Sequence, residues 1–249
     1  MKSVVVIQAR MGSTRLPGKV MRELCGKTVL GHVIARVKAC HLIDEVVVAT
    51  TVLERDDVVA EESRKHGARI FRGSEDDVLS RYYLAAREAG ADIVVRVTSD
   101  CPLYDHKVLS RMMEYFLSVY ATEERIDYYN NFLVRSFPRG LETEVFTYEA
   151  LEQAAREASK PYEREHVTPY IYLHPELFKF SGLQNDTDLS FHRWTLDTQD
   201  DWELISAIYQ QLGSEGDDIF SSDAVLELLK KNPELIQLNA HVKQKKLGE

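Results

Sequence analysis

A cationic segment follows the first apolar run of the chain. Residues 8–22 read QARMGSTRLPGKVMR and carry four basic side chains and no acidic one, in a chain of net charge −9. Gly12 and Gly18 allow the backbone to approach a ligand closely, and Ser13 and Thr14 add hydroxyl donors. A glycine-containing cationic loop that leaves a buried strand is typical of a phosphate-binding site. The alternative is a solvated basic loop, and the position after a strand favours the phosphate site.

The spacing of this loop differs from two common phosphate motifs. A P-loop has four residues between its glycines and then Lys and Ser or Thr. Here five residues lie between Gly12 and Gly18, and Val20 follows Lys19. The G-x-G-x-x-G pattern of dinucleotide-binding domains is also absent. The positive charge exceeds what a diphosphate requires, so it suits a triphosphate and the pyrophosphate that leaves it.

Two aspartates could hold a metal ion beside such a phosphate. Asp100 follows an apolar run that ends at Thr98, and Asp197 ends a segment, 193–197, in which we expect a strand. Carboxylates are ligands that Mg²⁺ prefers, and the metal would neutralise charge on a reacting phosphate. The alternative makes Asp100 a turn former and Asp197 only a helix cap, and Thr198 is a further N-cap candidate.

Alternating strands and helices must position these side chains. Apolar runs predict strands at residues 3–9, 45–51, 68–71 and 92–98, and helical spacing predicts helices at 29–37, 56–66 and 77–89. This alternation predicts an α/β fold with three α/β/α layers and a mostly parallel, Rossmann-like sheet. Ligands of such sheets bind at the carboxyl ends of the strands. The loops after Ala9, Phe71 and Thr98 are therefore the expected binding region.

The pattern is less regular after residue 106. We expect strands at 127–131, 144–147, 176–184 and 193–197, and helices at 108–120, 148–159, 200–212 and 222–231. No linker or repeat separates the two parts. The sequence therefore predicts one catalytic domain over residues 1–249, with a small inserted α+β subdomain at about 130–190.

Composition and cysteine content exclude several classes of protein. No run of 18 apolar residues is present, and the apolar run 4–9 is too short for a signal peptide. The net charge of −9 argues against general nucleic-acid binding. Cys25, Cys40 and Cys101 include no C-x-x-C pair, so neither a disulfide framework nor a zinc site is predicted. We expect a cytoplasmic protein without nucleic-acid or membrane partners, in which Cys101 is a buried thiol or, alternatively, a nucleophile.

The segment VVVIQARMGSTRLPGKVM resembles the opening of sugar nucleotidyltransferases. Within them it is similar to the cytidylyltransferases that activate 3-deoxy-manno-octulosonate and the acylneuraminates, and most of all to the spore coat polysaccharide biosynthesis protein F type. Five later blocks follow in the same order, at 73–82, 98–103, 138–146, 163–171 and 193–200. The resemblance spans about residues 3–212. Ser99 departs from it, because the family has glycine before the metal-binding aspartate.

The resemblance implies a Mg²⁺-dependent transfer of CMP from CTP to a sugar, an acidic keto sugar, with release of pyrophosphate for surface polysaccharide biosynthesis. It implies Asp100 and Asp197 as metal ligands, and a homodimer to which residues 130–190 contribute. The implied catalytic residues are Arg10, Lys19, Asp100 and Asp197. The implied nucleotide-binding residues are Ala9, Arg10, Gly12, Ser13, Arg15, Lys19, Arg72, Gly73, Asp76 and Thr98. The implied sugar-binding residues are Arg139, Glu142, Glu144, Arg164, Glu165 and His166.

Two other functions stay open at this point. A nucleotide-sugar glycosyltransferase would use a D-x-D motif, and Asp186-Thr187-Asp188 is the sole match, in an expected surface turn. A non-catalytic nucleotide-binding relative would explain Ser99, if the family's glycine has a positive φ or contacts the nucleotide.

Overall fold

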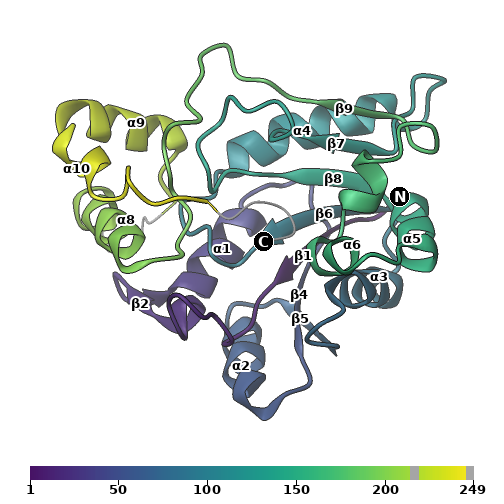
Figure 1. The fold of residues 1–249 in the computed structure, drawn as a ribbon, viewed down its shortest axis with the longest axis horizontal. Coiled ribbons are helices and arrows are strands. Elements are labelled where there is room, and N and C mark those ends of the chain that lie inside the picture. The colour runs from purple at the N-terminus through teal and green to yellow at the C-terminus, as the bar shows by residue number, and fades with distance from the viewer. Residues whose placement is uncertain (214–218, 245–249) are drawn as a thin grey trace.

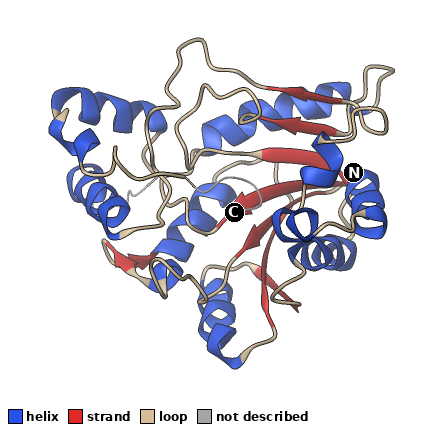
Figure 2. Ribbon diagram, in the orientation of Figure 1, coloured by secondary structure: helices blue, strands red, loops and turns tan. Residues whose placement is uncertain are grey.

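One seven-stranded sheet, in the order β5-β4-β1-β6-β8-β7-β9, forms the centre of the molecule. The structure is a computed structural model that describes residues 1–213 and 219–244. Helices cover both faces of the sheet (Figures 1 and 2). The three-layer α/β/α fold with a mostly parallel sheet is thus as predicted.

The four predicted strands of the first half are parallel neighbours. They are β1 (Ser3–Gln8), β4 (Glu45–Thr51), β5 (Arg69–Gly73) and β6 (Ile93–Thr98). β1 lies between β4 and β6, with Val6 opposite Val47 on one side and Arg96 on the other. Burial on both faces explains its unbroken apolar run, because Val4 and Val6 enter one core cluster and Val5 and Ile7 the other.

The second half extends the same sheet. β8 (Glu144–Thr147) runs antiparallel to both β6 and β7 (Tyr128–Asn130), and β9 (Phe180–Gly182) pairs parallel with β7. The segment 130–190 therefore contributes an inner strand, β8, and an edge strand, β9, to the main sheet. Its assignment to sugar binding and dimerisation stays a prediction.

The strand predicted at 193–197 is wrong. This segment forms only an isolated bridge between Arg139 and Arg193. Its backbone N–H groups instead donate to two different loops. The N–H of Trp194 donates to the carbonyl of Arg139, and that of Leu196 to the carbonyl of Asp100, both at 2.7 Å. The segment is a strap across the strand ends. Its alternation of apolar residues therefore reflects burial of side chains, and not the hydrogen-bond ladder of a strand.

The helices fall into two layers. The longer helices are α1 (Val29–Lys38), α2 (Asp57–Lys65), α3 (Val78–Ala89), α4 (His106–Tyr120), α5 (Tyr148–Glu157), α8 (Gln199–Leu212) and α9 (Ser222–Lys231). Apolar residues of α1, α4, α8 and α9 pack on one face of the sheet, and those of α3 and α5 pack on the other. In the part of the chain that is described, no helix is long and apolar enough to span a membrane.

Short elements that the periodicity did not predict complete the fold. They are the helices α6 (Pro161–His166), α7 (Pro169–Tyr172) and α10 (Glu234–Gln237), the 3₁₀ turns Lys19–Met21 and Glu54–Asp56, and the hairpin of β2 (Glu23–Leu24) and β3 (Lys27–Thr28). Each is too short to show a hydrophobic period. Two of them, the 3₁₀ turn at Lys19 and α6, carry side chains of the candidate site.

Candidate active site

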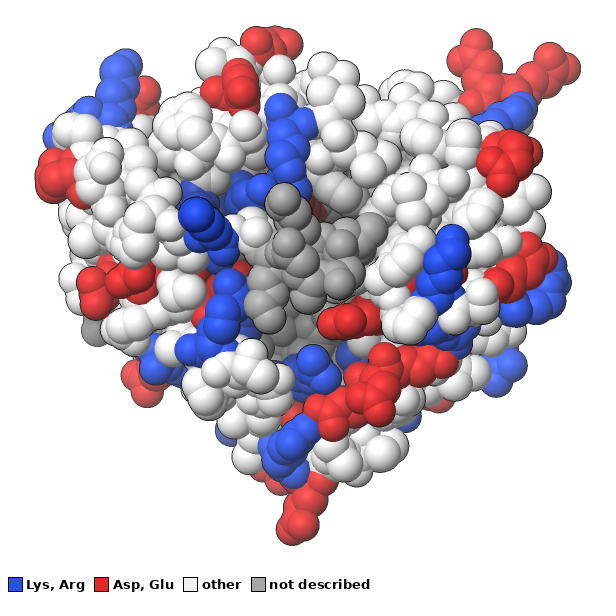
Figure 3. Space-filling view, in the orientation of Figure 1, with Lys and Arg blue, Asp and Glu red and all other residues white. Residues whose placement is uncertain are grey.

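A cavity of about 340 Å³ lies at the carboxyl ends of β1 and β6. Its walls come from the loop after β1, from α3 and α6, and from the strap that ends at Asp197. Basic side chains gather near the middle of the face drawn in Figure 3, toward which β1 and β6 point in Figure 1. The lining residues are Gln8, Ala9, Arg10, Gly12, Ser13, Thr14, Arg15, Lys19, Val20, Val78, Arg81, Thr98, Ser99, Asp100, Glu165, His166 and Asp197.

The loop after β1 is held from behind by a buried acid. The Asp56 carboxylate is fully buried and accepts the backbone N–H of Met11 at 2.7 Å. Gly18 has φ of 67°, which turns the chain into the 3₁₀ turn that begins at Lys19. These contacts direct Lys19 into the cavity, where the side chain is only 11% exposed.

Lys19 joins the two aspartates that the sequence singled out. Its Nζ atom lies 2.8 Å from Asp100 Oδ2, 2.8 Å from Asp197 Oδ1 and 2.7 Å from the carbonyl oxygen of Leu196. Burial opposes the charge on Lys19, but the two carboxylates outweigh it and raise the pKa of Lys19. Burial likewise opposes ionisation of Asp100, and Lys19 and the Thr98 hydroxyl nevertheless lower the pKa of Asp100. Lys19 and Asp100 are therefore both charged at neutral pH.

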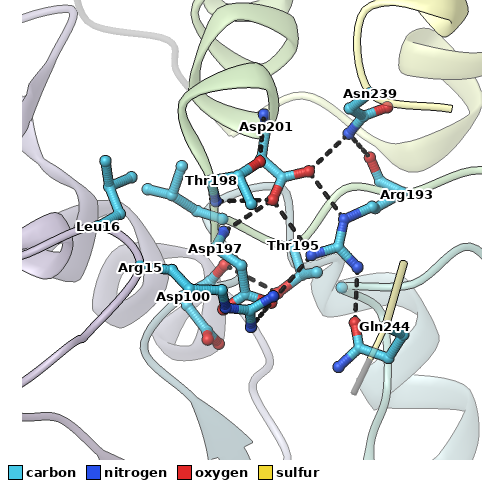
Figure 4. A network of polar contacts seen from close by, with 12 residues as sticks. Arg15, Leu16, Asp100, Arg193, Thr195, Asp197, Thr198, Asp201, Asn239 and Gln244 are labelled. Carbon is cyan, nitrogen blue, oxygen red and sulfur yellow. Dashed lines mark hydrogen bonds and ion pairs between the residues drawn. The ribbon is translucent and has the colours of Figure 1, made fainter. Parts of the chain in front are cut away.

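A second layer of contacts orients Asp197. Its Oδ2 atom lies 2.9 Å from both Arg15 and Arg193, as Figure 4 shows. Arg193 also donates to Asp201, and Asp201 accepts the backbone N–H groups of Asp197 and Thr198 at 2.9 Å. Thr198 caps α8, as predicted, by accepting the N–H of Asp201. The start of α8 thus fixes the position of Asp197.

The C-terminal part of the chain closes this network. Asn239 Nδ2 donates to the Arg193 carbonyl and to Asp201 Oδ1, both at 2.9 Å, and Arg193 Nη1 donates to Gln244 at 2.6 Å. Arg193, Asp201 and Asn239 were not predicted as site residues. The capping box T-x-x-D that begins at Thr198 was a usable signal for Asp201. No local pattern pointed to Asn239.

Asp100 and Asp197 fit a divalent cation. Both carboxylates reach one Nζ atom at 2.8 Å, so they converge on a single point. Across residues 1–213 and 219–244 no group of three or more His, Cys, Asp or Glu side chains could hold a metal. The remaining ligands of a Mg²⁺ here would be substrate oxygens and water, as is usual for that ion.

Three residues predicted to bind the nucleotide lie outside this cavity. Arg72 donates to the carbonyls of Thr51 and Leu53 and pairs with Asp57, so it braces the loop after β4. Gly73 pairs with Thr51 as the last residue of β5. Asp76 lines a neighbouring cavity together with Arg10 and Glu165. The Arg72 side chain is therefore committed to the loop after β4, and a nucleotide contact by these three residues stays a prediction.

The predicted sugar-binding residues divide into two groups. Glu165 and His166 line the cavity from α6. Arg164 points to Asp77, the N-cap of α3, at 3.0 Å from Nε to Oδ1, and lines the neighbouring cavity. Burial lowers the pKa of His166, so its imidazole is neutral at pH 7.

The other three lie farther along the sheet. Glu144 is 2% exposed and pairs with Arg96, accepts from Tyr128 at 2.8 Å and bonds Thr168. Its carboxylate is therefore committed to joining β6, β7 and α7. Arg139 and Glu142 lie on the turn before β8 and do not line the cavity, and Glu142 accepts the N–H of Gly140.

The remaining alternatives can be compared with the structure. Burial, and then Asp100, raise the pKa of the Cys101 thiol well above its usual value, which makes it a poor nucleophile. Ser99 lines the cavity, and among the described residues other than glycine only Cys25 and Val167 have a positive φ, so Ser99 causes no such strain. Asp186 and Asp188 are exposed and lie outside the cavity.

Six lining residues were not among the predicted site residues. They are Gln8, Thr14, Val20, Val78, Arg81 and Ser99. Most flank a predicted residue in the chain, so a wider window would have included them. Arg81 differs, because it reaches the cavity from within α3, and nothing in its local sequence separates it from a surface arginine of that helix.

Comparison with known proteins gives a consistent result. The cytidylyltransferase family model matches residues 4–247. The chain is 34% identical over 236 residues to the spore coat polysaccharide biosynthesis protein SpsF of Bacillus subtilis, covering 92% of this chain and 94% of that protein. A cytidylyltransferase structure from Leptospira borgpetersenii superposes with a TM-score of 0.89 at 39% identity, covering 99% of both chains. The structure of CMP:2-keto-3-deoxy-manno-octonic acid synthetase complexed with CTP shares the fold, with a TM-score of 0.63 at 18% identity over 85% of this chain and 99% of that one. The chain therefore belongs to the cytidylyltransferase family and is a nucleotidyltransferase.

Proposed function

We propose that the protein transfers CMP from CTP to a hydroxyl group of an acidic keto sugar, with Mg²⁺ bound, and releases pyrophosphate. The observation that carries this proposal is the convergence of Lys19, Asp100 and Asp197 within 2.8 Å beneath a cationic loop. A cation site beside phosphate-binding side chains is what phosphoryl transfer requires.

The cations of the loop act on the leaving group. Three cationic side chains of this loop line the cavity, those of Arg10, Arg15 and Lys19. As the bond to the α-phosphorus breaks, negative charge grows on the pyrophosphate, and these side chains stabilise it. Lys19 and Arg15 now contact carboxylates, so they exchange those partners for phosphate oxygens when the nucleotide binds.

Asp100 and Asp197 would hold the metal, and each has an outer partner. Asp100 Oδ1 accepts from the Thr98 hydroxyl at 2.6 Å, and Asp197 Oδ2 from Arg193 at 2.9 Å. Such partners fix the orientation of metal-binding carboxylates. When bound, Mg²⁺ supplies charge neutralisation at the reacting phosphate.

The acceptor sugar enters beside α6. Glu165 and His166 line the cavity there. The neutral imidazole of His166 can accept a proton or a hydrogen bond from the attacking hydroxyl, which aids general base catalysis. The complex of the fold relative with CTP supports the choice of nucleotide, and the name of that relative supports a keto sugar acid.

The test is pyrophosphate release by the purified protein. It is incubated with Mg²⁺, each of the four nucleoside triphosphates, and 3-deoxy-manno-octulosonate or an acylneuraminate. We expect release with CTP and a sugar acid, and none when EDTA replaces Mg²⁺. Release with another triphosphate in preference to CTP would contradict the nucleotide assignment, and release with neutral sugars alone would contradict the acceptor class.

The proposal extends to the cellular setting. The relative's name supports a role in surface polysaccharide biosynthesis. We also propose a cytoplasmic homodimer to which residues 130–190 contribute. Light scattering coupled to size-exclusion chromatography measures the mass, and a monomer near 28.6 kDa would contradict the dimer.

A further inference from the structure

Arg81 is a buried cation on the wall of the cavity. It lies on α3, is 2% exposed and lines the cavity beside Arg10. Its aliphatic carbons pack against the backbone of Gly73, and its Nη1 atom donates to the carbonyl of Ser74 at 2.6 Å. The helix and the end of β5 thus hold the guanidinium in one position.

No carboxylate in the described part of the chain pairs directly with this charge, and Asp56 and Glu75 favour it only from a distance. Within the described residues, Arg81 has that single hydrogen bond and no ion pair within 4.0 Å, and its Nε atom has no partner. The acids on its side are engaged elsewhere. Asp56 accepts from Met11 and Thr51, and Glu75 pairs with Arg10 and Arg55.

Three other buried or half-buried arginines show the contrast. Arg96 pairs with Glu144, and Arg193 with Asp197 and Asp201; burial opposes their charge, yet the carboxylates raise both pKa values. Arg36 donates to three oxygens, those of Tyr209, Tyr104 and Phe220. For Arg81, burial lowers the pKa.

A buried cation without an anion reduces stability, because the lost hydration is not compensated. An apolar side chain would pack on Gly73 equally well. A buried guanidinium on the wall of a cavity, with no ion pair among the described residues, is therefore explained best by a ligand that supplies the missing negative charge.

We propose that Arg81 binds an anionic oxygen of the substrate, either a phosphate of the nucleotide or the carboxylate of the acceptor, and that its charge is balanced only in the complex. This inference rests on the proposed function for the identity of the two substrates. It adds a binding residue from α3 to the loop cations Arg10, Arg15 and Lys19.

The test compares Arg81→Met and Arg81→Lys with Arg87→Met, which removes an exposed arginine from the same helix. Calorimetry measures CTP binding with Mg²⁺, and steady-state kinetics measures KM for the sugar acid. If Arg81 binds a phosphate, Arg81→Met weakens CTP binding by at least about tenfold; if it binds the carboxylate, CTP binding is unchanged and KM rises by at least about tenfold. For Arg81→Lys, which keeps the charge, we expect a CTP affinity and a KM between those of the wild type and Arg81→Met. For Arg87→Met, we expect both values to equal those of the wild type.

Thermal unfolding distinguishes a ligand role from a structural one. Without ligand, Arg81→Met melts no lower than Arg87→Met, because the lost charge had no ionic partner. Wild-type CTP binding and KM in Arg81→Met, together with a lower melting temperature, would overturn the inference. If the wild type binds no nucleoside triphosphate, the proposed function fails first. Inorganic pyrophosphate and the sugar acid are then the probes. Equal thermal stabilisation of the wild type and Arg81→Met by both probes would still overturn the role of Arg81.

Discussion

The two ends of the cavity treat charge in opposite ways. At one end Asp100 and Asp197 are surrounded by Lys19, Arg15 and Arg193, and every one of these charges has a partner within 3 Å. At the other end, beside α3, Arg81 has no ionic partner among the residues that are described.

This difference separates two ways of preparing a site for a polyanion. The paired end keeps its groups in place without ligand, but binding there requires an exchange of partners. The unpaired end gains a new charge interaction on binding, but it reduces the stability of the free protein. We therefore expect substitutions at the paired end to affect both stability and turnover, and those at the unpaired end to affect mainly binding.

The largest effect is expected at Asp100. Asp100→Ala removes one of two carboxylates that converge on the cation position, and we expect turnover to fall by at least about a thousandfold. Lys19 keeps Asp197 and the Leu196 carbonyl, so the fold persists. Pyrophosphate release and circular dichroism measure the two effects, with the exposed Asp186→Ala as control. Pyrophosphate release by Asp100→Ala at nearly the wild-type rate would show that this end of the cavity does not take part in the reaction.

Lys19→Met tests whether the paired end has a structural function. The change leaves the Asp100 carboxylate with two neutral donors, the Thr98 hydroxyl and the Cys101 thiol. We therefore expect a loss of about 3 kcal/mol in the free energy of unfolding, or roughly 6–12 °C in Tm. Turnover should fall about a hundredfold. Mg²⁺ should raise the Tm of this variant more than that of the wild type, since the ion replaces the ammonium between the carboxylates.

The control for this variant is Lys65→Met, because the Lys65 side chain is 71% exposed and its partner Glu62 keeps its bonds to Thr28 and His66. Its Tm should match the wild type within about 1 °C, as for most surface pairs. An equal Mg²⁺ response in Lys19→Met and the wild type would show that the two carboxylates do not form a cation site.

A smaller effect is expected from the network behind Asp197. Asn239→Ala removes the donor to Arg193 and Asp201, and we expect a loss of about 1–3 kcal/mol and a few degrees in Tm. The Mg²⁺ concentration for half-maximal activity should rise, because Asp197 is less well held. Asn232→Ala, which removes one donor to the Leu228 carbonyl at the end of α9, is the matched control. If both variants need the same Mg²⁺ concentration as the wild type, the network has no part in positioning Asp197.

The smallest effect concerns the ion pair between Arg164 of α6 and Asp77, the N-cap of α3, which lines the neighbouring cavity. Burial opposes ionisation of Asp77, but Arg164 and the N–H of Ser80 lower the pKa of Asp77 below its usual range. Its stabilising effect is therefore complete above about pH 4 and is lost as the pH falls through the lowered pKa. The Tm difference between the wild type and Asp77→Asn should narrow from pH 6 to pH 3. A Tm difference that does not change with pH would mean that the ion pair between Arg164 and Asp77 does not stabilise the folded protein.

Local sequence predicted much of the fold and part of the site. The apolar run of β1 and the cationic loop after it are adjacent in the sequence. The location of the expected phosphate site and its chemistry could therefore be deduced together. Asp100 follows a strand that periodicity marks clearly. Asp197 lies in the cavity beside Asp100, although the strand predicted before it does not exist, because burial alone produced the apolar pattern.

What the sequence did not predict depends on distant partners. Glu144 is an acidic residue in a polar cluster, which is why we expected it to bind the sugar. Its contacts with Arg96 and Thr168 form only when the sheet is folded. Whether Arg81 is paired depends on Asp56 and Glu75 being engaged elsewhere, which no spacing reveals. Asn239 reaches Arg193 across 46 residues.

The bond between Lys19 and Asp197 joins residues 178 positions apart. Closing such a long loop is entropically unfavourable until most of the sheet between its ends has formed. The cluster of Lys19, Asp100 and Asp197 should thus be among the last contacts made during refolding. Regain of nucleotidyltransferase activity after dilution from denaturant would then report complete folding, and it should lag behind the recovery of helical and sheet structure.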